Sequence, residues 1–118
     1  MVRHRVIIAL GSNTRQSVHI EWASQRMATL LCDVLFSRRL WTKDVNGKGV
    51  MYQNRLVRGL TTLSVEELEQ QLKQIEAALH RHGDKVTIDL DLMAYDAMRY
   101  HLRDWPRPYI QLLIEDIK

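Results

Sequence analysis

The chain has 118 residues, of which 46% are hydrophobic and 26% are charged, the proportions of an ordinary globular protein. Its formal net charge of +3 is a mild basic excess that a nucleic acid, a nucleotide or solubility alone could explain. No stretch reaches the roughly 20 apolar residues of a membrane span, the N-terminus lacks a signal-peptide cleavage pattern, and the single Cys32 excludes an intramolecular disulfide. We therefore predict one cytoplasmic domain over residues 1–118.

The first half of the chain alternates strand and helix patterns. Residues 4–10 are mostly apolar and predict a buried strand, which the Gly-Ser-Asn that follows should break. Apolar side chains recur at helical spacing over residues 16–31, which predicts an amphipathic helix. Residues 33–42 predict a second strand, a loop occupies 45–49, and residues 51–61 predict a third strand.

The second half begins with a helix signal. Ser64 and Glu67 form a capping box, and an apolar stripe follows it at Leu68, Leu72, Ile75 and Leu79. This helix should end at residues 82–84. A fourth strand is predicted over residues 86–95, a short extension over 97–102, and a short C-terminal helix in the final apolar segment.

The order strand-helix-strand-strand-helix-strand predicts an α+β fold of the ferredoxin-like βαββαβ type. Such a sandwich has a four-stranded antiparallel sheet with both helices on one face, here with a short C-terminal helix added. If helices cover one face, the apolar side chains of the fourth strand lie under them: Val86, Ile88, Leu90 and Leu92. Asp89 and Asp91 then lie on the open face.

The two aspartates need a reason, because aspartate is depleted in strands and like charges on one face repel. Residues two apart on a strand are separated by roughly 6.5 to 7 Å, so Asp89 and Asp91 can bracket a hard divalent cation such as Mg²⁺. Two acids on a solvated strand face would give the same short pattern, so the neighbouring motifs have to decide. The sequence has no Walker A loop, no dinucleotide-binding glycine motif and no zinc-type pair of histidines.

Four motifs taken together resemble one family. They are IALGSN at residues 8–13, Tyr52-x-Asn54, the helix EELEQQLKQIEAALHR and the strand TIDLDLMAYD. In this order and roughly this spacing they resemble the 6-hydroxymethyl-7,8-dihydropterin pyrophosphokinases of the folate pathway. The resemblance runs from about Val6 to Ile117. It implies the ferredoxin-like fold and the transfer of diphosphate from ATP to a pterin alcohol.

The resemblance also implies roles for charged residues. Asp89 and Asp91 are expected to hold two Mg²⁺ ions between the ATP phosphates and the pterin hydroxymethyl group. Arg81 and Arg107 are expected to face phosphate. A cation at the C-terminal end of the second helix is the alternative explanation of Arg81.

On the pterin side, the resemblance implies contacts from strands two and three and from the tail. Asn54 is expected to hydrogen-bond the pterin ring, since its amide offers both a donor and an acceptor. Thr42 is a second contact, Tyr52 part of the pocket wall, and Tyr109 a stacking partner for the ring. Ordinary strand packing for Thr42 and Tyr52, and a core position for Tyr109, stay open as alternatives.

Departures from the family pattern leave two other functions open. The family's long basic loop before the fourth strand is cut to HGDK, and Val86 stands where an arginine is expected. A degenerate relative that binds pterin, nucleotide or a protein partner without catalysis would show the same losses. A nucleic-acid-binding module of similar fold is disfavoured, because the third strand lacks the glycine-aromatic motif and the fourth carries acids. A monomer or an oligomer of unknown size fits the sequence.

Overall fold

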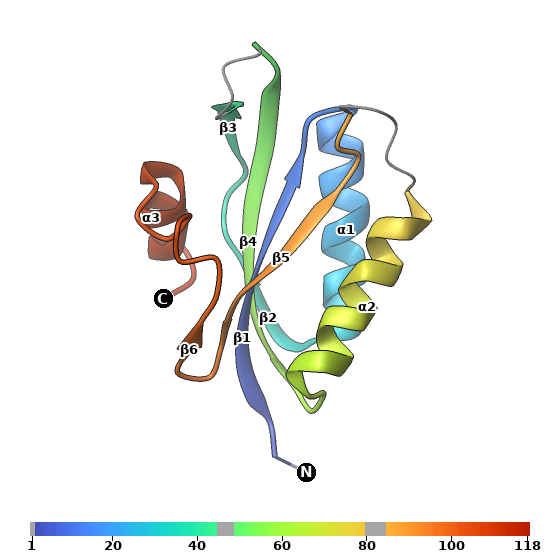
Figure 1. Ribbon diagram of the computed structural model, residues 1–118, viewed down its shortest axis with the longest axis vertical. Coiled ribbons are helices and arrows are strands. Elements are labelled where there is room, and N and C mark those ends of the chain that lie inside the picture. Colours follow the sequence, from blue (N-terminus) through green and yellow to red (C-terminus); the bar gives the residue numbers. More distant parts are fainter. Residues whose placement is uncertain (1, 45–48, 80–84) are drawn as a thin grey trace.

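An antiparallel sheet runs through the middle of the protein, with helices on both of its faces (Figure 1). The computed structural model describes residues 2–44, 49–79 and 85–118, and Arg81 and the predictions for 45–48 and 82–84 lie outside these ranges. The strands described are β1 His4–Ser12, β2 Cys32–Phe36, β3 Leu40–Lys43, β4 Met51–Thr61, β5 Asp89–Tyr95 and β6 Met98–Arg99. Their spatial order is β2-β4-β1-β5-β6, and β3 also pairs with β4.

The α+β class and the antiparallel sheet are confirmed, but the predicted number of four strands is wrong, since the described residues form six. Residues 33–42, predicted as one strand, form β2 and β3, which pair with opposite ends of β4. The two strands separate at Ser37, whose N–H donates to the Leu56 carbonyl over 2.9 Å and whose hydroxyl accepts from the Leu56 N–H over 2.8 Å. β6 lies within the predicted extension and pairs with β5. The ferredoxin-like class stays a prediction.

Two strand boundaries also differ from the sequence predictions. β1 continues through Gly11 and Ser12, which were predicted to break it, because both pair with residues of β4. β5 begins at Asp89, three residues later than predicted. Val86 instead exchanges hydrogen bonds with Asn13, donating to the Asn13 side chain over 2.6 Å and accepting from its N–H over 2.9 Å.

Two helices, α1 Gln16–Leu30 and α2 Val65–Ala78, cover one face of the sheet (Figure 1). The predicted capping box of α2 is confirmed: the Glu67 N–H donates to Ser64 Oγ, and the Ser64 N–H donates to Glu67 Oε1. Between these helices and the sheet lies the larger apolar core, which includes Ile8, Leu10, Ile20, Met27, Leu68, Leu72, Ile75, Ile88, Leu90 and Leu92. Three of the four side chains predicted to lie under the helices, Ile88, Leu90 and Leu92, therefore do so, while Val86 is not part of this core.

The opposite face of the sheet is not open, because α3 Pro108–Glu115 packs on part of it (Figure 1). A second apolar cluster lies there, made of Leu56, Met93, Ala94, Trp105, Ile110, Leu113 and Ile117. Trp105 is buried, and its indole N–H donates to the carbonyls of Tyr100 and Met93 over 2.9 and 3.2 Å. No helix in the described ranges is both long and apolar enough to cross a membrane.

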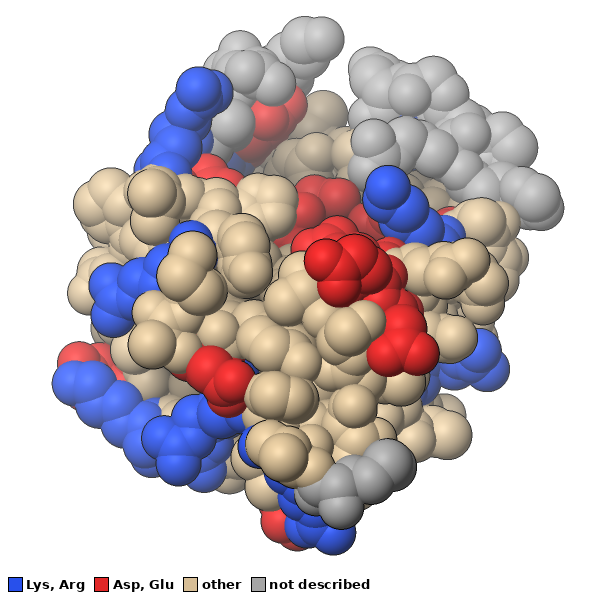
Figure 2. Space-filling view, turned by 60° about the horizontal axis from the view of Figure 1, so that its bottom comes forward, with Lys and Arg blue, Asp and Glu red and all other residues tan. Residues whose placement is uncertain are grey.

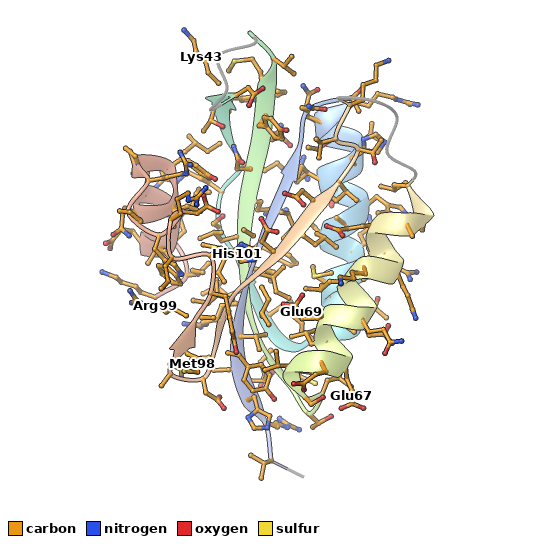
Figure 3. The ribbon with its side chains drawn as sticks, viewed as in Figure 1. Lys43, Glu67, Glu69, Met98, Arg99 and His101 are labelled. Carbon is orange, nitrogen blue, oxygen red and sulfur yellow. The ribbon has the colours of Figure 1, made fainter. Side chains whose placement is uncertain are left out.

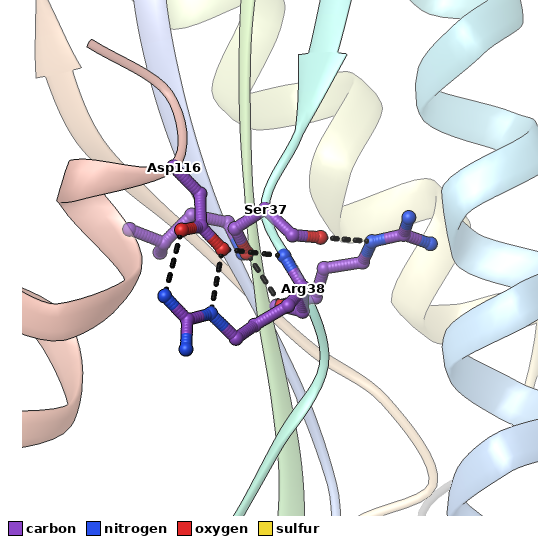
Figure 4. A network of polar contacts seen from close by, with 5 residues as sticks. Ser37, Arg38 and Asp116 are labelled. Carbon is purple, nitrogen blue, oxygen red and sulfur yellow. Dashed lines mark hydrogen bonds and ion pairs between the residues drawn. The ribbon is translucent and has the colours of Figure 1, made fainter.

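An ion pair ties the end of α3 to the break between β2 and β3 (Figure 4). Asp116 accepts three hydrogen bonds of 2.9 Å from Arg38, one from its backbone N–H and two from its guanidinium. These bonds lower the pKa of Asp116 to about 2. The helix that covers the second face is thus fixed at its start by Trp105 and at its end by Asp116.

Candidate active site

A cavity of about 220 Å³ lies on the α3 side of the sheet. Its walls come from β1, β3, β4, β5 and the start of α3. Every predicted site residue that the structure describes lines it: Thr42, Tyr52, Asn54, Asp89, Asp91, Arg107 and Tyr109. Arg81, the remaining predicted residue, lies outside the described ranges. Segments far apart in sequence are therefore brought together around one cavity.

The floor of the cavity is made by small residues of the central strand β1. Gly11 lies between Asp89 of β5 and Asn54 of β4, and Ala9 lies beside Asp91. A Cβ atom added at Gly11 would lie 3.7 Å from Asn54 Oδ1, which is ordinary contact. Larger side chains at these two positions would fill the space between the carboxylates and the asparagine.

The two carboxylates are partly buried on β5, and the charge of Asp89 disfavours the ionisation of Asp91. Burial, and after it the charge of Asp89, raises the pKa of Asp91 to about 6. His101 opposes this rise, since its Nε2 lies 3.8 Å from Asp91 Oδ1. Leu90 lies between the two aspartates in the sequence. Its N–H donates to the Glu76 carboxylate over 2.7 Å, which ties the strand to α2. A cation bound at this place would offset the repulsion between the two carboxylates.

Asn54 has its orientation fixed by neighbouring groups. Its amide NH₂ donates to Thr42 Oγ1 over 2.8 Å and to the Leu40 carbonyl over 3.2 Å. Asn54 is only 8% exposed, so the amide is held within the cavity wall. Its Oδ1 lies toward Gly11 and can accept a hydrogen bond from a ligand in the cavity.

The start of α3 supplies another wall. Arg107 is the N-cap residue, Pro108 occupies the first turn, and the Arg107 guanidinium Nε donates to Asp104 Oδ1 over 2.8 Å. Burial, then the charge of Asp104, raises the pKa of the Tyr109 hydroxyl. Tyr109 therefore presents a neutral hydroxyl and a partly buried ring to the cavity at neutral pH.

Several cavity residues were missed from the sequence. Asp44 lies two residues beyond Thr42, which the resemblance placed in the site, and a period of two could have placed Asp44 beside it. Lys43 also lines the cavity, and Figure 3 shows its side chain pointing outward from the end of β3. Asp104 lines the cavity, and His101 lies beside it, 3.8 Å from Asp91; both belong to the connection from β6 to α3, where no periodic pattern could have indicated their direction.

The donor set suits a divalent cation. Asp91, His101 and Asp104 each offer a ligand atom, and these atoms lie within 4.8 Å of one another. Asp89 stands beside Asp91 on the same strand face, and carboxylate oxygens are the ligands that hard dications prefer. Burial first, and then the like charge of Asp89, raises the pKa of Asp91, and a cation would offset that like charge.

Charge is unevenly distributed over the surface in spite of the small net charge. Figure 2 shows acidic side chains gathered near the middle of one face, while lysine and arginine lie mostly toward its rim. Such separation means that a local acidic field persists in a chain whose formal net charge is +3.

Comparison with protein families gives one match. The family model described as 7,8-dihydro-6-hydroxymethylpterin-pyrophosphokinase (HPPK) matches residues 7–117, essentially the whole chain. A comparison with curated proteins gives no match.

Proposed function

The chain belongs to the 7,8-dihydro-6-hydroxymethylpterin-pyrophosphokinase family, and we propose that it transfers diphosphate from ATP to the hydroxymethyl group of 6-hydroxymethyl-7,8-dihydropterin. The pterin hydroxyl oxygen forms a bond to the β-phosphorus of ATP. The bond from that phosphorus to the oxygen bridging the α and β positions breaks. AMP, the pterin diphosphate and one proton are the products, so the step needs no further reactant.

The single observation that carries this proposal is the composition of the cavity. Residues assigned to a pterin side and residues assigned to a phosphate side line the same 220 Å³ space. The two sides meet over the small floor residues Ala9 and Gly11, which leave room for the reacting groups. Holding two substrates in one orientation is a large part of what a phosphoryl-transfer enzyme contributes.

On the pterin side, Asn54 is the orienting group. Because its NH₂ is engaged by Thr42 and Leu40, its Oδ1 remains directed toward the cavity as an acceptor for a ring N–H of the pterin. Tyr52 and Tyr109 line the same space and offer aromatic surface to a flat heterocycle. These residues bind and orient the ring without taking part in bond making.

On the phosphate side, Asp89 and Asp91 would hold the Mg²⁺ ions that the family reaction uses. Bound there, Mg²⁺ would neutralise charge on the transferring phosphates. Arg107 adds a guanidinium at the cavity wall, held in place by Asp104. The place of Arg107 directly before α3 suits contact with a phosphate, since backbone N–H groups at the start of a helix add to the positive charge of the guanidinium.

The test is pterin-dependent release of AMP from ATP in the presence of Mg²⁺. Asp89→Asn and Asp91→Asn remove the charge of each carboxylate while keeping its shape. Asp33→Asn is the matched control, because Asp33 is exposed on β2 and does not line the cavity. We expect a loss of about 10²-fold or more in each site variant and none in the control. Full activity in both site variants would contradict the proposal.

The AMP assay, combined with calorimetry of pterin binding, distinguishes an enzyme from a non-catalytic relative. Arg107 is already paired with Asp104, and this pairing reduces the free positive charge that the described residues offer to ATP. A protein that binds the pterin in calorimetry but releases no AMP above background at high concentration would be such a binder. The catalytic proposal would then be wrong, and the pterin pocket would stand.

A further inference from the structure

We propose that His101 and Asp104 join Asp91 as ligands of one divalent cation, and that the imidazole makes this site select Mn²⁺ over Mg²⁺. This inference rests on the proposed function, which requires a divalent cation at β5. It adds two ligands from a different part of the chain. It also assigns the imidazole a part in the metal preference of the site.

The ligand atoms already lie close to the spacing that one ion needs. Two ligands on opposite sides of an ion with bonds of about 2.2 Å are about 4.4 Å apart, and adjacent ligands are closer. The three ligand atoms lie within 4.8 Å of one another, and His101 Nε2 is 3.8 Å from Asp91 Oδ1. Side-chain rotations alone could bring them to bonding distance.

The segment that carries both new ligands, residues 100–107, is held in place by its own hydrogen bonds. The Asp104 N–H donates to the His101 carbonyl over 2.8 Å, and the Arg107 N–H donates to the Asp104 carbonyl over 3.0 Å. Trp105 lies buried beneath, with its indole N–H bonded to the Tyr100 carbonyl. The imidazole and the carboxylate are therefore presented to Asp91 from a fixed backbone.

Asp104 can serve both a cation and Arg107. One of its carboxylate oxygens accepts from the Arg107 guanidinium over 2.8 Å, which leaves the other for the metal. This hydrogen bond orients the carboxylate in the way that outer-shell partners orient metal ligands. It also limits the repulsion that a third carboxylate would bring to Asp89 and Asp91.

The preference for Mn²⁺ follows from the nitrogen ligand. Mg²⁺ is held by oxygen and keeps several waters. Mn²⁺ also takes oxygen ligands, but as a transition-metal ion it accepts an imidazole nitrogen more readily than Mg²⁺ does. His101 is 40% exposed at its side chain, and Figure 3 shows it over the sheet, so an ion from solvent can reach its ring. Removing the imidazole should therefore affect the two metals unequally.

The experiment measures binding of Mn²⁺ alone to the full chain, without nucleotide, from the loss of the free Mn²⁺ signal in electron paramagnetic resonance. Mg²⁺ affinity is obtained by competition. His101→Asn removes the imidazole and suits the backbone, because the φ of 54° at this residue is one that asparagine adopts readily. Asp104→Asn tests the carboxylate. Arg103→Ala, an exposed change in the same segment, is the control.

We expect the unaltered protein to bind Mn²⁺ about tenfold or more tightly than Mg²⁺. His101→Asn should lose about tenfold or more in Mn²⁺ affinity and change Mg²⁺ affinity by less than about threefold. Asp104→Asn should weaken both metals, and Arg103→Ala neither. The inference is overturned if the unaltered protein binds no Mn²⁺, or if His101→Asn binds it as well as the unaltered protein.

Failure here differs from failure of the proposed function. If Asp91→Asn loses metal while His101→Asn and Asp104→Asn keep it, the extra ligands are wrong and the aspartate pair stands. If the imidazole proves to bind Mn²⁺ but no AMP is released from ATP with either metal, the metal site stands and the diphosphate transfer is wrong.

Discussion

Asp91→Asn is expected to stabilise the cation-free protein at neutral and higher pH. Burial and the charge of Asp89 raise the pKa of Asp91 from 3.8 to about 6 in the folded state. Below the unfolded value of 3.8 the carboxyl is protonated in both states and carries no penalty. As the pH rises through 6, the folded protein must ionise a group that it holds unfavourably, so stability is lost. Asparagine cannot ionise and avoids this loss.

The size of the effect follows from the shift in pKa. A rise from 3.8 to about 6 corresponds to about 3 kcal/mol of lost stability above pH 6, at about 1.36 kcal/mol for each unit. The Asp91 side chain keeps 32% of its exposure, so solvent screens part of this energy. We therefore expect about 1 to 2 kcal/mol. In a domain of this size that is a rise of roughly 3 to 10 °C in melting temperature.

The assay is urea unfolding with a chelator present, at about pH 4 and about pH 8, for the unaltered protein, Asp91→Asn and the control Asp33→Asn. The stabilisation by Asp91→Asn should appear at the higher pH and nearly vanish at the lower. Adding Mg²⁺ or Mn²⁺ at the higher pH should stabilise the unaltered protein and not Asp91→Asn. A variant that is less stable than the unaltered protein at about pH 8, without cation, would refute this reasoning.

Two further predictions concern the cavity floor and the end of α3. Gly11→Ala should leave the free energy of unfolding within about 1 kcal/mol of the original but weaken pterin binding in calorimetry, because the methyl group takes space from the cavity. Its control, Gly59→Ala, places a Cβ 3.0 Å from Leu31 and should destabilise by about 1 to 3 kcal/mol in the same unfolding assay. Asp116→Asn should destabilise at neutral pH and not near pH 2, since Arg38 lowers the pKa of Asp116 to about 2 and the stabilisation is lost as pH falls from 3.8 toward that value. An equal loss at both pH values would contradict the assignment to charge.

The alternation in residues 86–95 was enough to predict which side chains face the helices. A strand has only two faces, so once Ile88, Leu90 and Leu92 are placed in the core, Asp89 and Asp91 must lie on the other side. The number of strands could not be predicted in the same way. The break at Ser37 carries no glycine or proline, and the serine hydroxyl itself replaces a sheet hydrogen bond to Leu56.

The candidate site shows the same difference between residues that the sequence could predict and residues that it could not. Residues on strands, such as Asn54 and Asp91, could be predicted because a motif of the resemblance contains each of them, and for Asp91 a period of two also gives the face of the strand. His101 and Asp104 could not, because the direction of each depends on Trp105 being buried beneath residues 100–107. Burial of one tryptophan is a tertiary event with no local pattern, so this part of the site is visible only in the folded structure.

The position of α3 links the site to contacts far from it. Arg107 and Tyr109 reach the cavity because the helix that starts there lies against the sheet. Trp105 fixes its start, while Asp116 fixes its end to Arg38 at the break between β2 and β3. The separation of those two strands, which contradicts the simpler four-stranded prediction, is what exposes the Arg38 N–H to Asp116. The irregularity in the sheet is therefore part of how the cavity wall is held in place.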